Sequence, residues 1–312
     1  MKQFIRNLII FIVIGVVSII IFTIIYVENK SLEFVDNFHY EKDSPSFLYN
    51  RIREADTTKN VDVAFFGTSQ TYRGIDPRIF AEKGIRIFNL GSSNQTPIQT
   101  ETLVNRYIAQ LNPKIVIFEI NPESLSMDGI ESAIDFNNHA KIDKHIIKMT
   151  LRLNSIKTWF SLIYTCYRQL LNLDASYKHP NKIHNDTYII GGFVEKKYHP
   201  FYGQTFDNIV NPQYYQMFAL KRTLKVLKRT NAEIILVQMP LEKATYSKLG
   251  EKQKFYQHLS SFGLTYYNYN SFFSLNKKYF LDNFHLNQMG VDTFNRDLIK
   301  RLNLVQKIKS NE

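Results

Sequence analysis

The stretch that decides the fold is Val61–Ser69, which reads VDVAFFGTS. Its first six residues form a short apolar, β-rich run that ends at Gly67. Continuous runs of this kind are typical of strands buried on both faces of a parallel sheet. Other runs of the same type are Ile85–Leu90 before Gly91, Lys114–Ile120 before Asn121, Glu233–Met239 before Pro240 and a weaker one at Leu264–Tyr269.

Helical patterns separate these predicted strands. Apolar residues recur at helical spacing in Gln99–Leu111, Tyr214–Arg229 and Gln288–Leu302. Strands that alternate with helices indicate βαβ units and an α/β fold with an open, doubly wound sheet. In such sheets the functional crevice lies beyond the carboxyl ends of the strands, so the residues just after each strand are the candidates for chemistry.

The N-terminus predicts a membrane anchor. Leu8–Val27 (LIIFIVIGVVSIIIFTIIYV) carries no charge and is long enough to span a hydrocarbon core of about 30 Å as a helix. A cleavable signal peptide would have a shorter apolar region and a small-residue cleavage site, which is not seen here. Lys2 and Arg6 lie in the tail of residues 1–7, so we expect a cytoplasmic N-terminus and an exported body.

Composition narrows the class of partner. The 312 residues include 39 Lys+Arg, 28 Asp+Glu and one Cys, Cys166, which excludes an internal disulfide framework and a Cys-rich zinc module. Without residues 1–30, which hold three basic residues and one acidic one, 36 basic and 27 acidic residues remain. This excess favours an anionic partner such as lipid or an envelope polymer. No nucleic-acid-binding module is recognisable, so nucleic acid is not expected.

The remaining organisation is simple. Residues 28–60 are interpreted as a linker and residues 61–305 as the α/β domain, with an insertion at about 124–211 that would form a lid or a binding surface. Ile142–Leu173 within the insertion has a helical pattern. The basic stretch Lys221–Arg229 is interpreted as a solvated helix face. The histidines of the insertion lack the usual spacing of metal ligands, and no metal is expected.

Two short segments carry the candidate chemistry. Ser69 follows the Gly67 turn, where a serine serves either as a helix cap or as a nucleophile activated by a base. The second segment is Leu281–Gly290 (LDNFHLNQMG), in which Asp282 and His285 are three residues apart. An Asp there can orient the imidazole toward a Ser, although a turn residue beside a half-buried His has the same sequence.

Together these residues resemble the SGNH/GDSL hydrolase family. The family marks are a Ser in a Gly-containing turn after the first strand, a Gly after the second, an Asn after the third and Asp-x-x-His before the last helix. Ser69, Gly91, Asn121 and Asp282-x-x-His285 stand at these places. Thr68 replaces the customary Asp before the Ser, and Asn94 takes the position of a second Gly, whose left-handed backbone Asn tolerates. Asn121 stands in the run FEINP (118–122) and not in the usual Gly-x-Asn-Asp setting.

The resemblance implies a three-layer α/β/α fold with a central parallel sheet in flavodoxin-like strand order. It also implies no metal or organic cofactor and a Ser69–His285–Asp282 triad. It also implies an oxyanion hole built around Gly91, Asn94 and Asn121. The membrane-anchored layout resembles cell-envelope acyl-transfer proteins, such as the D-alanyl transfer protein of lipoteichoic acid synthesis and the O-acetylation proteins of bacterial exopolysaccharides. Those proteins often work beside a polytopic membrane acyltransferase.

We therefore expect a single-pass protein of the bacterial cell membrane. It would act as a serine esterase or O-acyltransferase on acetyl or D-alanyl esters of an extracytoplasmic envelope glycopolymer or a lipid-linked substrate. One alternative is a catalytically inactive SGNH-like scaffold in an envelope polysaccharide assembly or acylation complex. Another is a lipid hydrolase that faces the cytosol.

Overall fold

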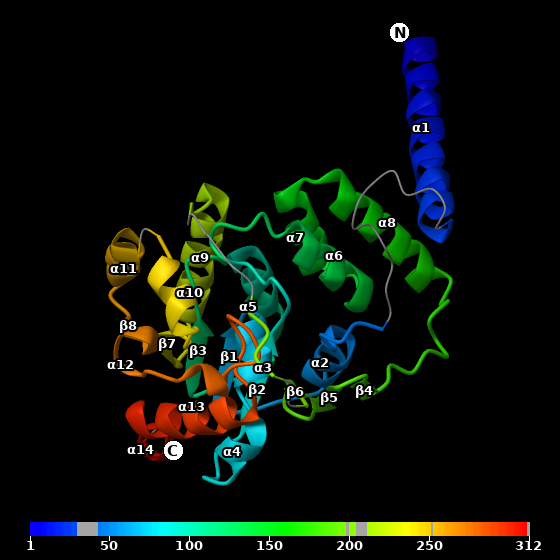
Figure 1. Ribbon diagram of the computed structural model, residues 1–312. Coiled ribbons are helices and arrows are strands. Elements are labelled where there is room, and N and C mark those ends of the chain that lie inside the picture. The colour runs from blue at the N-terminus through cyan, green and yellow to red at the C-terminus, as the bar shows by residue number, and fades with distance from the viewer. Residues whose placement is uncertain (30–42, 198–199, 204–210, 251, 311–312) are drawn as a thin grey trace. The chain divides into compact units, whose positions relative to one another are not determined.

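The computed structural model describes residues 1–29, 43–197, 200–203, 211–250 and 252–310 (Figure 1). The chain divides into two compact units. The helical unit comprises residues 1–42 and Ala133–Lys178, and the α/β unit comprises Asp43–Ser132 and His179–Glu312. Residues 30–42 of the expected linker, and 198–199 and 204–210 of the expected insertion, lie outside the described residues.

A parallel sheet forms the centre of the α/β unit. Its strands lie in the order β2-β1-β3-β7-β8, which is the flavodoxin-like order, and every neighbouring pair is parallel. The predicted α/β class and its strand order are therefore confirmed. The strands are β1 (Val63–Gly67), β2 (Ile87–Gly91), β3 (Ile115–Glu119), β7 (Glu233–Gln238) and β8 (Thr265–Asn268).

Helices cover both faces of this sheet (Figure 1). Alternate residues of β1, β3 and β7, such as Phe65, Ile117 and Val237, pack with Ile79 of α4 and Phe294 of α13 in one buried core. The other alternate residues face α5 and α9. The bounds are α3 (Ser69–Gly74), α4 (Pro77–Ala81), α5 (Pro97–Leu111), α9 (Tyr214–Leu227), α10 (Lys243–Lys248), α11 (Lys252–Ser260), α12 (Tyr269–Phe272), a 3₁₀ turn (Lys277–Tyr279), α13 (Gln288–Arg301) and α14 (Leu304–Ser310).

The α/β unit also contains elements that the sequence patterns did not predict. Helix α2 (Leu48–Ala55) lies in the segment expected to be a linker, and Ile52 and Ala55 are fully buried. A small antiparallel sheet of β4 (Lys182–Ile183), β5 (Asp186–Ile189) and β6 (Phe193–Lys196) lies in the expected insertion. Neither element had a clear apolar period, because each is short and mixes polar with apolar residues.

A buried ion pair joins this small sheet to α3. Arg73 Nη1 lies 2.7 Å from Asp186 Oδ1, and the two side chains are only 13% and 8% exposed. Nearby, the buried guanidinium of Arg51 lies 4.5 Å from the centre of the Tyr72 ring, and its Nε donates to the carbonyl of Gly192. The helix that begins with Ser69 is therefore fixed from two sides, by the parallel sheet and by the antiparallel sheet.

The helical unit contains α1 (Lys2–Glu28), α6 (Ile130–His139, which begins at the border of the unit), α7 (Lys144–Leu153) and α8 (Ile156–Leu170). The most apolar part of α1 has a mean hydropathy of 3.4 and is 6% buried, so this helix is long and apolar enough to cross a membrane. The predicted helical stretch Ile142–Leu173 is two helices. They separate at Asn154, whose backbone is left-handed with φ 45° and caps α7.

We expect Arg73→Ala to destabilise the protein by about 3 kcal/mol, because the buried Asp186 carboxylate then keeps only the longer ion pair with Lys196 Nζ, at 3.9 Å. Urea unfolding of the detergent-solubilised chain measures this. Arg53→Ala is the matched control, since Arg53 is 45% exposed and 3.7 Å from Asp56, and it should cost less than about 1 kcal/mol. Equal costs for the two variants would contradict a structural role for the buried pair.

Candidate active site

The turn between β1 and α3 presents Ser69. The side chain of Thr68 accepts a hydrogen bond from the Gln70 N–H and caps α3, so Ser69 is the first helical residue and its hydroxyl is not the cap. Two glycines permit this tight turn. A Cβ at Gly67 would come within 2.6 Å of Glu119 Cβ, and one at Gly91 within 2.8 Å of the Thr68 carbonyl oxygen. The turn thus packs directly onto β2 and β3.

Three side chains form a continuous hydrogen-bonded chain at this edge of the sheet. Ser69 Oγ lies 2.8 Å from His285 Nε2. On the other side of the ring, His285 Nδ1 lies 2.9 Å from Asp282 Oδ2 and 3.0 Å from Oδ1. The His285 side chain is 21% exposed, so the group lies at the surface of the unit. This is the connectivity that activates a serine for nucleophilic attack.

The loop that carries Asp282 and His285 is held by its own hydrogen bonds. Asp282 Oδ1 accepts from the backbone N–H groups of Phe284 and His285, each at 2.8 Å. The Leu281 N–H donates to the His285 carbonyl, and Asn287 caps α13 by accepting from the Gly290 N–H. Partial burial opposes ionisation of Asp282, but the hydrogen bonds from His285 and from the backbone outweigh it, so the pKa of Asp282 lies below its usual value. An ionised Asp282 suits the stabilisation of an imidazolium.

Gln70 connects the two halves of the site. It is the residue after Ser69 and is 4% exposed. Its Nε2 donates to the Phe284 carbonyl at 2.9 Å, and its Oε1 accepts from Asn121 Nδ2 at 3.1 Å. One side chain thus links the loop of His285 to the end of β3. No sequence pattern singled out Gln70; its only signal was its position directly after the candidate nucleophile Ser69.

The expected oxyanion residues lie at the ends of β2 and β3. Asn94 has a left-handed backbone with φ 48°, and its side chain donates to Glu131. Asn121 is 6% exposed, and its Oδ1 accepts from the N–H groups of Glu123 and Ser124. Gly91 differs from the other two, because its N–H already donates to Asn89 Oδ1 at 3.0 Å. Because Gly91 has no side chain, the Thr68 carbonyl oxygen can lie close to the backbone at the end of β2.

Glu119 is a buried carboxyl group directly behind the turn. Its Oε2 accepts from the Thr68 N–H at 2.6 Å and from the Thr71 hydroxyl at 3.2 Å. Within the described residues its Oε1 has no hydrogen-bond partner. Burial raises the pKa of Glu119 above its usual range, although the bonds from Thr68 and Thr71 act in the opposite direction. In the sequence Glu119 is part of the predicted strand Lys114–Ile120, and its only signal was a charged residue near the end of an apolar run.

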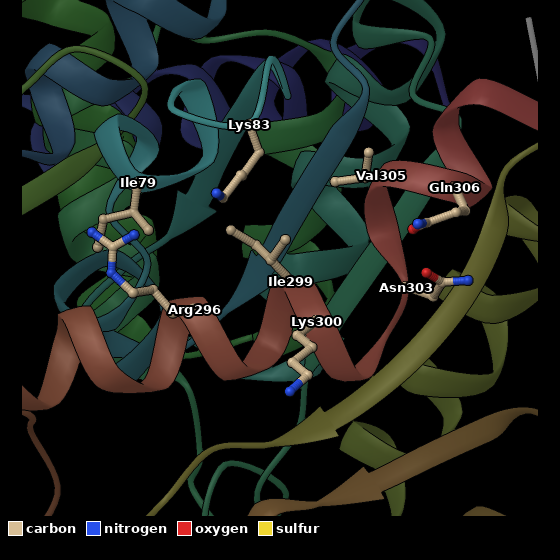
Figure 2. Close-up of a pocket in the computed structure, with 8 residues that line it drawn as sticks. All are labelled: Ile79, Lys83, Arg296, Ile299, Lys300, Asn303, Val305 and Gln306. Atoms are coloured by element: carbon tan, nitrogen blue, oxygen red, sulfur yellow. The ribbon is translucent and has the colours of Figure 1, made fainter.

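Within the part of the chain that the structure describes, no three His, Cys, Asp or Glu side chains gather as a metal ion requires. Figure 2 shows a pocket of about 450 Å³ elsewhere, beside the C-terminal half of α13. It is lined by Ile79, Lys83, Arg296, Ile299, Lys300, Asn303, Val305 and Gln306. None of these residues belongs to the Ser69 group.

Comparisons with known proteins give distant likenesses. No family model matches the chain, and no curated protein matches it. Among solved structures, a protein from Bacteroides fragilis NCTC 9343 assigned as an acylhydrolase is 13% identical with a TM-score of 0.41, covering 86% of this chain and 100% of its own. A family 3 carbohydrate esterase from Clostridium thermocellum is 11% identical with a TM-score of 0.38, covering 80% and 98%. Both TM-scores are below 0.5, and neither likeness assigns a family or an activity to this chain.

The pKa of Asp282 gives a pH-dependent stability. Since the pKa in the folded state is below that of the unfolded chain, about 3.9, the ionised carboxylate stabilises the fold above that pH and this contribution is lost as pH falls. The difference in unfolding free energy between the natural protein and Asp282→Asn should therefore shrink between about pH 5 and pH 3. Urea titrations at several pH values measure it. A difference that stays constant over this range would contradict the assignment.

Proposed function

We propose that this chain is a membrane-anchored, SGNH-like serine esterase or O-acyltransferase. Its substrates would be acetyl or D-alanyl esters of an extracytoplasmic envelope glycopolymer. The single observation that carries the proposal is the hydrogen-bonded chain Ser69–His285–Asp282, with 2.8 Å between Ser69 Oγ and His285 Nε2. A structural serine that merely capped α3 would have no reason to face an imidazole held by a carboxylate.

The proposed reaction has two steps. In the first, His285 Nε2 accepts the proton of Ser69 while Oγ bonds to the acyl carbon of the ester. The imidazolium then gives this proton to the departing alcohol, and the acyl group remains on Ser69. In the second step, His285 takes a proton from a water molecule or a sugar hydroxyl while that oxygen bonds to the acyl carbon. The bond between the acyl carbon and Ser69 Oγ then breaks, and His285 returns the proton to Oγ. Asp282 keeps Nδ1 of the ring protonated and stabilises the imidazolium in both steps.

The negative charge on the carbonyl oxygen needs hydrogen-bond donors. The backbone N–H groups of Ser69 and Asn94 and the side-chain amide of Asn121 would supply them. Asn121 Nδ2 carries two hydrogens and gives one to Gln70, so one N–H is left for the oxyanion. Donors aimed at this oxygen typically supply a large part of the rate enhancement. In this proposal Gln70 positions Asn121 and the His285 loop with one side chain.

The proposed setting follows from α1 and from charge. A membrane-inserted α1 would place the body at the membrane surface, where the basic excess of residues 31–312 suits anionic polymers and lipids. The positive residues Lys2 and Arg6 before the span support a cytoplasmic N-terminus. A polytopic membrane acyltransferase that supplies acyl groups would be a suitable partner for such a protein.

The competing proposal is an inactive SGNH-like scaffold in an envelope acylation complex. Two departures from the SGNH/GDSL pattern support it. Thr68, which caps α3, stands where that pattern has an Asp, and Asn94 stands where it has a Gly. The two proposals differ in one property, the nucleophilicity of Ser69.

Ser69→Ala should abolish labelling by a fluorophosphonate probe and lower p-nitrophenyl acetate hydrolysis by about three orders of magnitude or more, because the covalent step needs Oγ. Gel fluorescence and release of p-nitrophenolate measure the two effects. Ser271→Ala is the matched control: Ser271 is exposed on α12, and its hydroxyl donates to the Asn268 carbonyl. That variant should behave as the natural protein does.

Ester hydrolysis that is equal in Ser69→Ala and in the natural protein would refute the triad. A folded natural protein that neither takes up the probe nor cleaves esters would support the scaffold instead. Release of acetate or D-alanine from an acylated envelope polymer then tests the substrate class.

A further inference from the structure

Helix α8 of the helical unit carries an exposed apolar stripe on one side, whereas its apolar residues Leu162 and Tyr164 are buried on the other side. Ile156 and Leu170 are 65% and 85% exposed, whereas Thr158, Ser161 and Thr165 are buried. A surface helix of a globular protein normally has one apolar stripe, which faces the core, so a second, exposed stripe on α8 calls for a partner. The exposed stripe follows alternating steps of three and four residues and consists of Ile156, Trp159, Ile163, Cys166 and Leu170, which we call the α8 face. Trp159 and Ile163 are half-buried members of this stripe.

Helix α8 lies next to the end of the candidate membrane span, which it contacts through side chains outside the α8 face. The Phe160 ring is 6.2 Å from the ring of Phe22 in α1, and the Tyr164 hydroxyl donates to Glu28 at 3.5 Å. Thr23 and Tyr26 of α1 are buried, although the rest of that helix is largely exposed. Helix α8 therefore contacts the last turns of α1, where a span of residues 8–27 would leave the hydrocarbon (Figure 1).

Helix α7 adds basic charge to the same unit. Both charged and apolar side chains are exposed on α7. The charged ones are Lys144 and Lys148, and the apolar ones are Ile147 and Leu151, which are 40% and 55% exposed. Residues 141–157 contain five Lys or Arg against one acidic residue, Asp143. The Asp143 carboxylate is used to cap α7. Apolar side chains beside lysines and arginines, with a tryptophan among them, are the composition of helices that bind anionic membrane surfaces.

We propose that α7 and α8 rest in the headgroup region of an anionic bilayer, with the α8 face directed into the lipid. This inference rests on the membrane insertion of α1 proposed above and does not depend on the chemistry of Ser69. It assigns the helical unit a second role besides carrying the anchor: it is a platform that lies on the membrane beside the span. An interface helix of this kind buries its apolar side about 5–10 Å into the headgroup and acyl boundary.

Trp159 is the only tryptophan in the chain, so its fluorescence reports α8 alone. The full chain is reconstituted into vesicles of phosphatidylcholine and phosphatidylglycerol whose acyl chains carry bromine either near the headgroup or near the methyl end. We expect a blue-shifted emission, strong quenching by the shallow bromine and weaker quenching by the deep bromine. Emission that bromine leaves unchanged and that aqueous acrylamide quenches freely would overturn the platform.

Ile156→Glu and Leu170→Glu place charge on the α8 face and should each reduce bromine quenching and red-shift the emission. Ile190→Glu is the matched control, because Ile190 is 81% exposed in the α/β unit, and it should leave both signals unchanged. Density flotation of the same vesicles measures the anchor separately. Protein that floats while Trp159 stays in water refutes the platform and leaves the anchor, whereas protein that does not float refutes both. A platform that forms only when another membrane protein is added would also refute lipid as the occupant.

Discussion

The hydrogen bond between Ser69 and His285 joins two residues that are 216 positions apart in the chain. It exists because β1 and its neighbours are parallel and end at one edge of the sheet, where the last loop before α13 also lies. Parallel strands need crossover helices, and those helices bury both faces of the sheet. The geometry of the site is therefore a consequence of the same packing that stabilises the α/β unit. A displaced β1 turn would separate the nucleophile from its base.

Much of this arrangement was predictable from the sequence. Val61–Phe66 and the runs before Gly91, Asn121 and Pro240 marked the strands, since strands buried on both faces must be apolar throughout. The elements without such a signal were not predicted. Helix α2 is a single short helix that packs into the α/β unit through the buried side chains of Ile52 and of Phe47, the residue before it. Strands β4–β6 mix charged with apolar residues. Their burial depends on distant partners, such as Arg73 for Asp186, which no local pattern reveals.

The residues of the site likewise divide into those that the sequence predicted and those that it did not. Ser69 and Asp282-x-x-His285 were identified because their chemistry requires those residue types. Gln70 and Glu119 were not, because their importance lies in contacts made across the fold. Gln70 links the His285 loop to Asn121, and Glu119 holds the Thr68 N–H behind the nucleophile. Where the sequence departs from the family pattern, at Thr68 and Asn94, the structure gives each residue a defined conformation: Thr68 caps α3 and Asn94 is left-handed.

The proposed chemistry depends on one property of the site: the imidazole of His285 makes Ser69 a nucleophile that carries an acyl group. Stopped-flow mixing of the purified chain with p-nitrophenyl acetate tests it most directly, because a covalent acyl-serine intermediate that breaks down slowly gives a burst of product before the steady state. We expect a burst of one p-nitrophenolate per protein molecule in the natural chain and no burst in a folded His285→Ala variant. A linear time course in the natural chain at the rate of the His285→Ala variant would contradict it.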